Sequence, residues 1–380
     1  MHEPTFDQDE ISAALEVLAS KRVTQGEKVK EFEHTFADMF GYGHAVACNS
    51  GSSANLLAIS ALMALGKLKP GDEVIVSALS WSTTVFPLIQ HGLVPVFVDC
   101  DPHTFNMNVM AMLNALSPRT RAVMPVHVYG NPCDMDFIVQ FCGLHELLLI
   151  EDGCEAMGAT YGGESVGSFG IAGTFSFYFS HHVTTLEGGM VVTDDAELAD
   201  MLRIQRSHGW LRDVNDDSRW PVPEGFDPRF YFVELGYNLR LTEMQAAMGL
   251  VQLTKLSSFV EKRRELLTIL SERLQSGWMN LQKETPYGES SAFGTAIIGS
   301  PGLRRHAQSK GIETRPVIAG NLARHPGIAK YPHLIRGSLD VADKILHDGF
   351  AVPCHQGMTN DDAHAIADVL WDYSEVESHS

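Results

Sequence analysis

The sequence contains no lysine between Lys69 and Lys255. The central part of the chain therefore offers no primary-amine side chain, although it holds most of the motifs considered below. Basic residues are scarce overall, because 28 lysines and arginines stand against 47 aspartates and glutamates in 380 residues, a formal net charge of −19. Such a surface repels nucleic acids and anionic membranes, so neither is expected as a partner.

Two further absences concern the cellular compartment. No apolar run approaches the roughly 20 residues that span a bilayer, and the start MHEPTFDQDE lacks the basic and apolar regions of a signal peptide. The six cysteines are scattered and show no C-x-x-C spacing: Cys48, Cys100, Cys133, Cys142, Cys154 and Cys354. These features predict a cytoplasmic protein with reduced thiols.

Short apolar runs alternate with helical patterns over the first two thirds of the chain. Seven runs predict strands: HAVACNS, DEVIVSA, VPVFVD, RAVMPVHV, ELLLIED, GTFSFYF and GGMVVTD. Helices are predicted for SSANLLAISALMALG, NVMAMLNAL and DAELADMLRIQRSHG. The strands are continuously apolar rather than alternating, which is typical of a sheet covered on both faces. We therefore predict an α/β fold with a mainly parallel sheet.

The pattern changes near residue 250. Apolar residues then recur at helical spacing at Leu253, Leu256, Val260, Leu266 and Leu270. This spacing predicts a long helix that joins a large α/β domain, residues 1–250 with a helical N-terminal segment, to a small C-terminal α+β domain, residues 251–380. The polar, proline-containing region 211–230 is predicted to be a long loop, and loops of that length are often functional.

The motif CNSGSSANLL follows a predicted strand and opens a predicted helix. The backbone N–H groups of Gly51, Ser52 and Ser53 would point at whatever lies above the helix N-terminus, a position suited to a phosphate. No Gly-Lys-Ser/Thr follows, so the motif is not a Walker A loop. A plain strand-to-helix turn with a serine cap would fit the same residues.

Two more predicted strand ends carry distinctive side chains. Asp152 and Glu155 follow the apolar run LLLI, where a carboxylate must be paired, bind a ligand or cap a helix. Trp81 follows another strand and would either pack or stack on a planar ligand. Together with the CNSGSSANLL motif, these two strand ends meet the needs of pyridoxal phosphate. This cofactor requires donors for its phosphate, a flat apolar surface for its ring and an acid for its ring nitrogen.

Seven blocks occur in the order found in one enzyme family: SGSSANLLAISAL, GDEVIVSALSWSTT, VPVFVDCDPHTFNM, LLIEDGCEAMGA, FSFYFSHHVTTLEGGMVVTDD, GYNLRLTEMQAAMGL and GIETRP. Over nearly its whole length the chain resembles the DegT/DnrJ/EryC1/StrS sugar aminotransferases, which are fold-type I pyridoxal-phosphate enzymes. The resemblance implies a cofactor site built from Gly51, Ser52, Trp81, Asp152, Glu155, Ser176 and Asn238. Asn238 would reach the phosphate from a neighbouring subunit, which implies a homodimer with shared active sites.

The chain departs from this family at one position. In the family's aminotransferases, a lysine six residues before Glu-Gly-Gly forms a Schiff base with the cofactor, and the same count back from Glu187 gives His181. A histidine here resembles the family's 3-dehydratase branch. Its ordinary pKa near 6.5 suits a catalytic base. A packing histidine, or a metal ligand paired with His182, would be the alternative, but strand neighbours point to opposite faces and chelate poorly, so no metal site is expected.

The 3-dehydratase resemblance implies a reaction. The cofactor would be pyridoxamine 5′-phosphate, formed from pyridoxal 5′-phosphate with L-glutamate as amino donor. The substrate would be a nucleotide-diphosphate 4-keto-6-deoxy sugar, with GDP-4-keto-6-deoxy-D-mannose favoured, which would lose its C3 hydroxyl on the way to a 3,6-dideoxysugar. His181 and Asp152 would be catalytic. A related iron–sulfur dehydratase is disfavoured, because no cysteine lies between Cys154 and Cys354.

Several residues are candidates for substrate binding: His208, Arg212, Arg219, Arg229 and Arg315. The guanidinium fork suits diphosphate oxygens, although solvated surface charge would explain the arginines equally well. Two other functions stay open at this point. One is a conventional nucleotide-sugar aminotransferase whose lysine arrives from elsewhere, and the other is a non-catalytic cofactor-binding protein.

Overall fold

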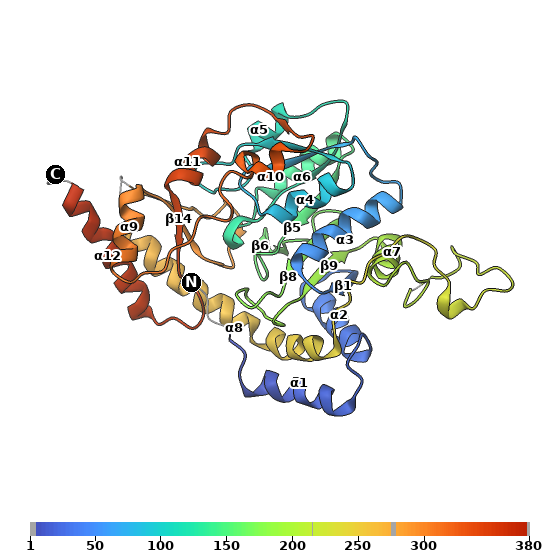
Figure 1. Ribbon diagram of the computed structural model, residues 1–380. Coiled ribbons are helices and arrows are strands. Elements are labelled where there is room, and N and C mark those ends of the chain that lie inside the picture. The colour runs from blue at the N-terminus through green and yellow to red at the C-terminus, as the bar shows by residue number, and fades with distance from the viewer. Residues whose placement is uncertain (1–4, 215, 275–278, 378–380) are drawn as a thin grey trace.

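The computed structural model describes residues 5–214, 216–274 and 279–377 (Figure 1). Its centre is an eight-stranded sheet with the strand order β1 (His44–Cys48), β9 (Gly189–Thr193), β8 (Ala172–Ser176), β5 (Leu148–Asp152), β4 (Thr120–Met124), β2 (Glu73–Ser77), β3 (Val94–Val98) and β13 (Leu334–Ile335). All seven predicted strands are present in this sheet. The strands from β13 to β8 pair in parallel, so the predicted α/β fold with a mainly parallel sheet is confirmed.

The edge of the sheet near β8 is antiparallel. β8 pairs with β9, and β9 pairs with β1, in antiparallel register. Antiparallel neighbours need only a short connection rather than a helical crossover. The short connection between β8 and β9 is the segment 177–188, which carries His181 and His182. This geometry leaves both histidines at the carboxyl end of β8.

Twelve α-helices surround the sheets in the described part of the chain: α1 (Gln8–Ser20), α2 (Glu27–Phe40), α3 (Gly51–Ala64), α4 (Ser82–Gln90), α5 (Val109–Asn114), α6 (Met135–Leu144), α7 (Ala196–Arg206), α8 (Glu243–Arg273), α9 (Pro301–Ser309), α10 (Pro326–Ala329), α11 (Asp340–Asp348) and α12 (Asn360–Glu377). Alternate residues of β2 enter different cores, since Val74 and Val76 pack with α3 and α4 while Ile75 packs with α5 and α6. Helices therefore cover both faces, as the continuously apolar strands predicted.

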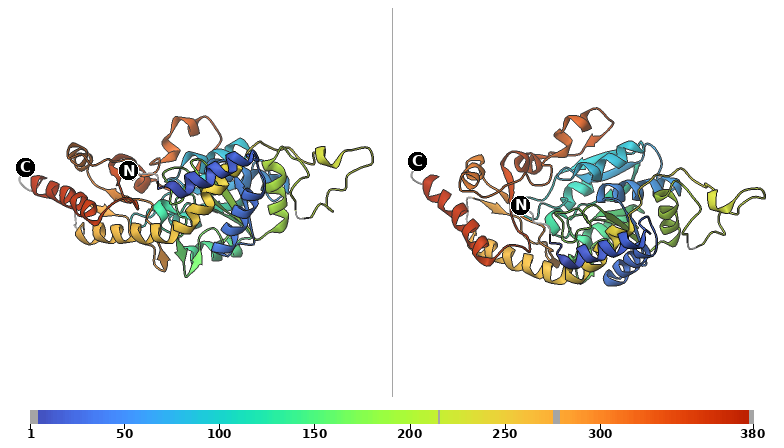
Figure 2. Two further views of the ribbon diagram at one scale, coloured as in Figure 1. Left: turned by 90° about the horizontal axis from the view of Figure 1, so that it is seen from below. Right: turned by 60° about the horizontal axis from the view of Figure 1, so that its bottom comes forward.

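The long helix α8 starts earlier than the apolar spacing indicated. Thr242 and Gln245 form a capping box at its N-terminus, and that pair of reciprocal hydrogen bonds fixes the start of the helix. α8 runs along the molecule in both views of Figure 2 and passes through the proposed domain division between residues 250 and 251. This division stays a prediction, and β13 from the C-terminal part pairs with β3 of the large sheet.

Two small antiparallel sheets complete the fold. One is formed by β10 (Asn280–Leu281), β12 (Thr295–Ile298) and β14 (Gly349–Val352), and the other by β11 (Gly288–Glu289), β6 (Thr160–Tyr161) and β7 (Glu164–Ser165). The first packs with α9, α12 and the end of α8 around Leu266, Phe350 and Leu370. No described helix has the length and apolar character that crossing a membrane requires.

Residues 207–237 form an arm that projects beside α7 (Figures 1 and 2). Apart from residue 215, which lies outside the described part, the arm contains a single short 3-10 helix, Pro228–Phe230. Isolated bridges between Trp210 and Phe232 and between Ser207 and Asn238 join its two sides. The predicted long loop at 211–230 is therefore present, as the outer part of this arm.

Candidate active site

A cavity of about 680 Å³ opens at the carboxyl ends of β1, β2, β4, β5 and β8. Ligands of open α/β sheets bind at this edge, because the turns that follow the strands meet there. The far wall comes from the C-terminal part of the chain, through Phe293, Arg315, Pro316 and Ile318. The sequence-predicted residues that line the cavity are Gly51, Ser52, Trp81, Asp152, Glu155, Ser176, His181 and Arg315.

The N-terminus of α3 borders one end of the cavity. Ser50 caps the helix by accepting a hydrogen bond from Ser53 N–H, while the N–H groups of the first turn point outward as at any helix start. A Cβ on Gly51 would lie only 2.5 Å from Ser176 Cβ, so glycine is required for α3 to approach Ser176 this closely. Gly51, Ser52 and Ser176 thus form a compact corner of a kind that suits an anion.

Asp152 lies at the end of β5 and is 4% exposed. Its Oδ2 accepts hydrogen bonds from Asn55 Nδ2 at 2.9 Å and from Thr84 Oγ1 at 2.7 Å, and its Oδ1 accepts one from Cys154 N–H at 3.1 Å. Three donors converge on this one buried carboxyl group and fix its orientation. Asp152 is therefore placed where a carboxylate could meet the ring nitrogen of a planar ligand.

Trp81 occupies the N-cap position of α4, and 54% of its surface is exposed. A tryptophan this open is unusual for a residue whose common role is packing. Its ring lines the cavity, so it offers an apolar plate for a planar ligand. The structure thus favours the stacking interpretation of Trp81 over the packing one.

Glu155 differs from Asp152 although the two carboxyl groups share the cavity. Burial, reinforced by the nearby charge of Asp152, raises the pKa of Glu155 to about 8, despite a hydrogen bond of 3.1 Å from Tyr129 N–H. The carboxyl group is therefore mostly protonated at neutral pH. In that form it can donate a hydrogen bond to a ligand rather than contribute a second negative charge.

His181 lines the cavity from the segment between β8 and β9. Its ring centroid lies 5.0 Å from that of Phe293 and 6.0 Å from that of Tyr178. Burial, together with the positive charge of Arg263, lowers the pKa of His181 to about 3. Its Nδ1 is buried and has no hydrogen-bond partner, so Nε2 is the ring nitrogen that can receive a proton from the cavity. At neutral pH His181 is thus an uncharged base.

His182 points elsewhere. It is fully buried, and its Nε2 lies 3.0 Å from the carbonyl oxygen of Ser291. Within the described ranges, no three His, Cys, Asp or Glu side chains gather closely enough to hold a metal ion. The two adjacent histidines therefore have different surroundings, and His181 is the one that faces the cavity.

The other predicted site residues lie away from this cavity. Asn238 is exposed at the base of the arm, and the His208 ring packs against Trp210 with centroids 5.1 Å apart. Arg212 lies over the Trp210 ring at 5.8 Å, and Arg229 pairs with Asp227 at 2.6 Å. Arg219 contacts Asp200 at 2.7 Å beside α7. Of the four predicted arginines, Arg315 is the one that lines the cavity.

The cavity also contains residues that the sequence did not single out for a role: Asn55, Thr83, Cys154, Tyr129, Tyr178 and Phe293. Asn55 follows Ser52 by three positions on α3 and therefore shares its helix face, a signal that could have identified it. Phe293 had no local signal, because it reaches the cavity from a segment more than 100 residues distant in sequence. Its position depends on the tertiary fold.

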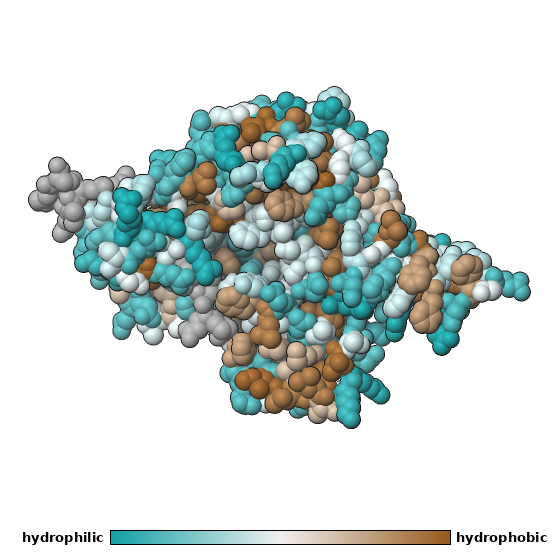
Figure 3. Space-filling model, in the orientation of Figure 1, coloured by the Kyte–Doolittle hydropathy of each residue, from teal (hydrophilic) through white to brown (hydrophobic). Residues whose placement is uncertain are grey.

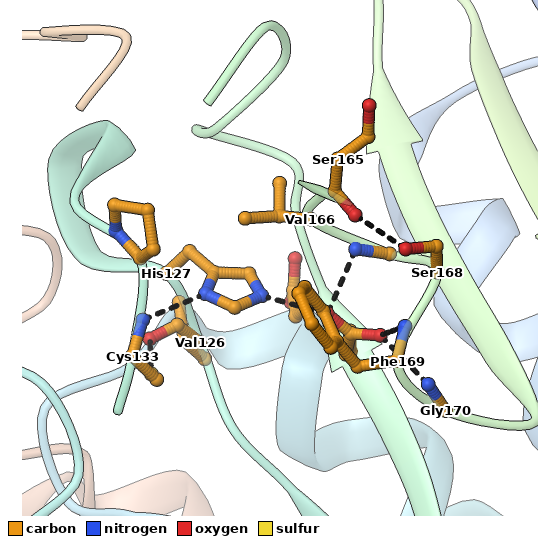
Figure 4. A network of polar contacts seen from close by, with 12 residues as sticks. Val126, His127, Cys133, Ser165, Val166, Ser168, Phe169 and Gly170 are labelled. Carbon is orange, nitrogen blue, oxygen red and sulfur yellow. Dashed lines mark hydrogen bonds and ion pairs between the residues drawn. The ribbon is translucent and has the colours of Figure 1, made fainter. Parts of the chain in front are cut away.

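A buried polar network lies behind the end of β5 (Figure 4). The Glu151 carboxyl group accepts hydrogen bonds from the N–H groups of Gly167, Phe169 and Gly170 at 2.7–2.9 Å, and His127 Nε2 lies 3.2 Å from Glu151 Oε2. The N–H of Cys133 donates to His127 Nδ1 at 3.0 Å, which leaves the ring proton on Nε2. This network fixes the backbone immediately before Asp152.

The model of the DegT/DnrJ/EryC1/StrS aminotransferase family matches residues 4–371. The chain therefore belongs to this family. Among its relatives is GDP-4-keto-6-deoxy-D-mannose 3-dehydratase from Yersinia pseudotuberculosis, which is 42% identical over 366 residues that cover 93% of each protein. The chain is thus a member of a family that includes nucleotide-sugar 3-dehydratases.

Two solved structures are similar to the fold described above. A histidine-to-asparagine variant of GDP-4-keto-6-deoxymannose-3-dehydratase (ColD) with bound GDP-perosamine superimposes with a TM-score of 0.93 at 38% identity, covering 97% of this chain and 99% of that one. A GDP-4-keto-6-deoxymannose-3-dehydratase with a trapped PLP-glutamate geminal diamine gives 0.91 at 37% identity, with the same coverage. Pyridoxal phosphate and a GDP-sugar are thus ligands of these similar enzymes.

Proposed function

We propose that this protein is a pyridoxamine-phosphate-dependent 3-dehydratase of a nucleotide-linked 4-keto-6-deoxy sugar, with L-glutamate as amino donor. GDP-4-keto-6-deoxy-D-mannose is the favoured substrate. One observation carries the proposal: an uncharged histidine, His181, lines a cavity with features suited to the cofactor, at the position where the family's aminotransferases have lysine. Neither Lys69 nor Lys255 lines this cavity.

The residues of the cavity fit the cofactor in three ways. The corner of Gly51, Ser52 and Ser176 would hold the phosphate, Trp81 would stack on the ring, and Asp152 would pair with the ring nitrogen. The buried carboxyl group of Asp152 already accepts three hydrogen bonds and is oriented by them. Glu155, protonated at neutral pH, would add a hydrogen-bond donor at the ring's edge.

When bound as pyridoxamine phosphate, the cofactor supplies an amine that joins the C4 ketone of the sugar and a ring that accepts electrons. The first step is the removal of a proton, and His181 Nε2 would take it up. The C3 hydroxyl can leave only after this step. The same Nε2–H then donates its proton to the departing oxygen. Burial lowers the pKa of His181, which weakens it as the base of the first step and favours the second step, because a protonated His181 gives up its proton readily. Asp152 would pair with the ring nitrogen and keep the proton there.

The absence of lysine determines which product leaves. A lysine amine would displace the product and complete a transamination, whereas an imidazole cannot hold the cofactor covalently. The sugar would therefore leave as an enamine that hydrolyses in water to a 3-deoxy-4-keto sugar and ammonia. A conventional aminotransferase would need a lysine in the cavity, and a non-catalytic binding protein would need neither His181 nor Glu187, which both line it.

The absence of a cavity lysine leads to the first prediction. Borohydride reduction of the cofactor-loaded protein is expected to leave the cofactor dissociable, because only a Schiff base with an amine side chain is reduced to a permanent link. Mass spectrometry of the denatured protein checks this result. A family aminotransferase with its active-site lysine serves as the positive control, and a cofactor-labelled peptide from this chain would contradict the proposal.

The arm supports a homodimer with shared active sites. It carries exposed apolar side chains, with exposed fractions of 58% for Phe226, 61% for Phe230 and 85% for Leu235, and Figure 3 shows apolar side chains on this projection. Arg212 and Arg229 lie on the same arm, away from their own cavity. We propose that the arm and Asn238 reach the cavity of a second subunit, where these arginines would meet the sugar diphosphate.

Subunit complementation tests this arrangement. His181→Asn damages the cavity of a subunit, and Asn238→Ala damages what that subunit gives to its neighbour. Mixing and refolding the two inactive variants is expected to restore about a quarter of the parental activity, because half the dimers are mixed and each of these has one intact site. Refolding each variant alone is the control. A mixture as inactive as its parents, or a fully active monomer in sedimentation, would rule out shared sites.

A further inference from the structure

The second histidine of the pair has no part in the proposed chemistry, yet it is the more deeply buried of the two. Since a carbonyl oxygen can only accept, His182 Nε2 carries a hydrogen and donates it to Ser291 O at 3.0 Å. Ser291 belongs to the segment 290–294, which we term the strap. The ring centroid of Phe293, in the strap, lies 5.7 Å from that of His182 and 5.0 Å from that of His181.

The strap is also anchored from α8. Arg263 is 1% exposed, and its Nη1 donates to the carbonyl oxygens of Phe293 at 3.0 Å and of Cys354 at 2.9 Å, with a longer bond of 3.3 Å to Ala292 O. A buried guanidinium that donates to several backbone carbonyls fixes the chain that carries them. Arg263 therefore anchors the strap to α8.

A third set of contacts joins the strap to the turn at Tyr129 and Gly130. Ser291 N–H donates to Gly130 O, and Phe293 N–H donates to Tyr129 O, both at 3.0 Å. Gly130 has a φ of +84°, and a Cβ there would lie 2.6 Å from Ser291 Oγ. The strap is thus held on three sides, and Phe293 is pressed toward the imidazole of His181.

We propose that His182 is a positioning residue, which holds the strap so that Phe293 covers the His181 ring and keeps water from it. The packing of Phe293 against His181 follows from these contacts. Its effect on catalysis rests on the proposed role of His181 as base. Phe293 and the strap backbone close off the imidazole of His181. The imidazole therefore stays uncharged and keeps its Nε2 directed at the cavity. A mobile strap would leave the ring hydrated and free to turn.

The titratable groups around His181 come from several elements. They are Asp152, Glu155, Glu187 and Arg315 in the cavity, Tyr178 on its own segment and Arg263 from α8. Burial and the positive charge of Arg263 both oppose a protonated imidazole. Because burial is the largest cause that lowers the pKa of His181 to about 3, removal of the cover should raise this pKa toward the ordinary value near 6.5.

Histidine titration by NMR tests the proposal without substrate or cofactor. The resonance of His181 in the complete protein is assigned by its loss in His181→Asn, and is then followed with pH in His182→Leu, which removes the hydrogen bond but keeps an apolar side chain. His182→Gln restores a donor near the position of Nε2. His91→Leu is a matched control, because His91 also contacts a backbone carbonyl, Pro87 O at 2.8 Å, at the end of α4 opposite Trp81.

His182→Leu is expected to raise the pKa of His181 by about two pH units or more toward its ordinary value, whereas His182→Gln and His91→Leu should leave it near the parental value. Phe293→Leu, which removes the ring but keeps the backbone contacts, should give a smaller rise and serves if His182→Leu does not fold. An unchanged pKa of His181 in the folded His182→Leu protein, or in Phe293→Leu if the former is unfolded, would overturn the proposal. A rise in His182→Gln equal to that in His182→Leu would overturn the part assigned to the hydrogen bond.

Discussion

Replacement of His181 by asparagine is expected to lower the rate of C3 hydroxyl loss by about 10²–10⁴-fold, the usual cost of losing a general base. Asparagine has a similar size and forms hydrogen bonds, but it cannot take up a proton at neutral pH. Binding of cofactor and ketosugar should persist, since the phosphate corner, Trp81 and Asp152 are untouched. Steady-state rates of ammonia release, together with absorption titration of the cofactor, measure the two properties separately.

His34→Asn is a suitable control for this experiment, because His34 is exposed on α2, where its Nε2 lies 3.3 Å from Asp38 Oδ2, and it does not line the cavity. The proton transfer should not depend on it, so His34→Asn should leave the rate of hydroxyl loss near the parental value. If His181→Asn eliminates the hydroxyl at the parental rate, another residue is the base. The proposed role of His181 would then be wrong.

Replacement of Asp152 by asparagine is expected to weaken cofactor binding by about 10- to 100-fold, since hydrogen bonds to charged groups contribute about 1.5–3 kcal/mol. The change removes the negative charge opposite the ring nitrogen. It also places an amide NH₂ among the donors Asn55, Thr84 and the N–H of Cys154, which now converge on the carboxyl group. Fluorescence titration with pyridoxal phosphate gives the dissociation constant directly.

Asp195→Asn provides the matched control. Asp195 caps α7 by accepting from Glu197 and Leu198 N–H, and asparagine is nearly as good a cap as aspartate. It should leave the dissociation constant for the cofactor unchanged. Equal affinity of Asp152→Asn and the parent protein would mean that Asp152 does not meet the ring nitrogen.

Most of the main sheet could be predicted, because strands buried on both faces are continuously apolar and their ends coincide with turn residues. The direction of the strands was less predictable. Nothing local in GGMVVTD tells whether β9 runs parallel or antiparallel to β8, since direction depends on the short connection through His181. The two-residue strands, such as β6 and β11, carry too few residues for any periodic signal.

The candidate site was predictable where chemistry and strand ends coincide, as at Ser52 and Asp152. Asn55 and Thr84 were missed, because each supports Asp152 from a different helix and that meeting exists only in the folded chain. The arginines illustrate the opposite difficulty. Sequence showed their charge but not their surroundings, and the fold places Arg315 in the cavity and Arg219 on Asp200.

The central claim is that this chain removes a sugar hydroxyl rather than adding an amine. The most direct measurement incubates the protein, pyridoxal phosphate and L-glutamate with GDP-, CDP- and dTDP-linked 4-keto-6-deoxy sugars, and quantifies ammonia and sugar products by mass spectrometry. The account predicts ammonia in equal amount to a 3-deoxy-4-keto sugar, with the GDP-linked substrate preferred. A stable 4-amino sugar that keeps its C3 hydroxyl, formed without ammonia, would contradict it.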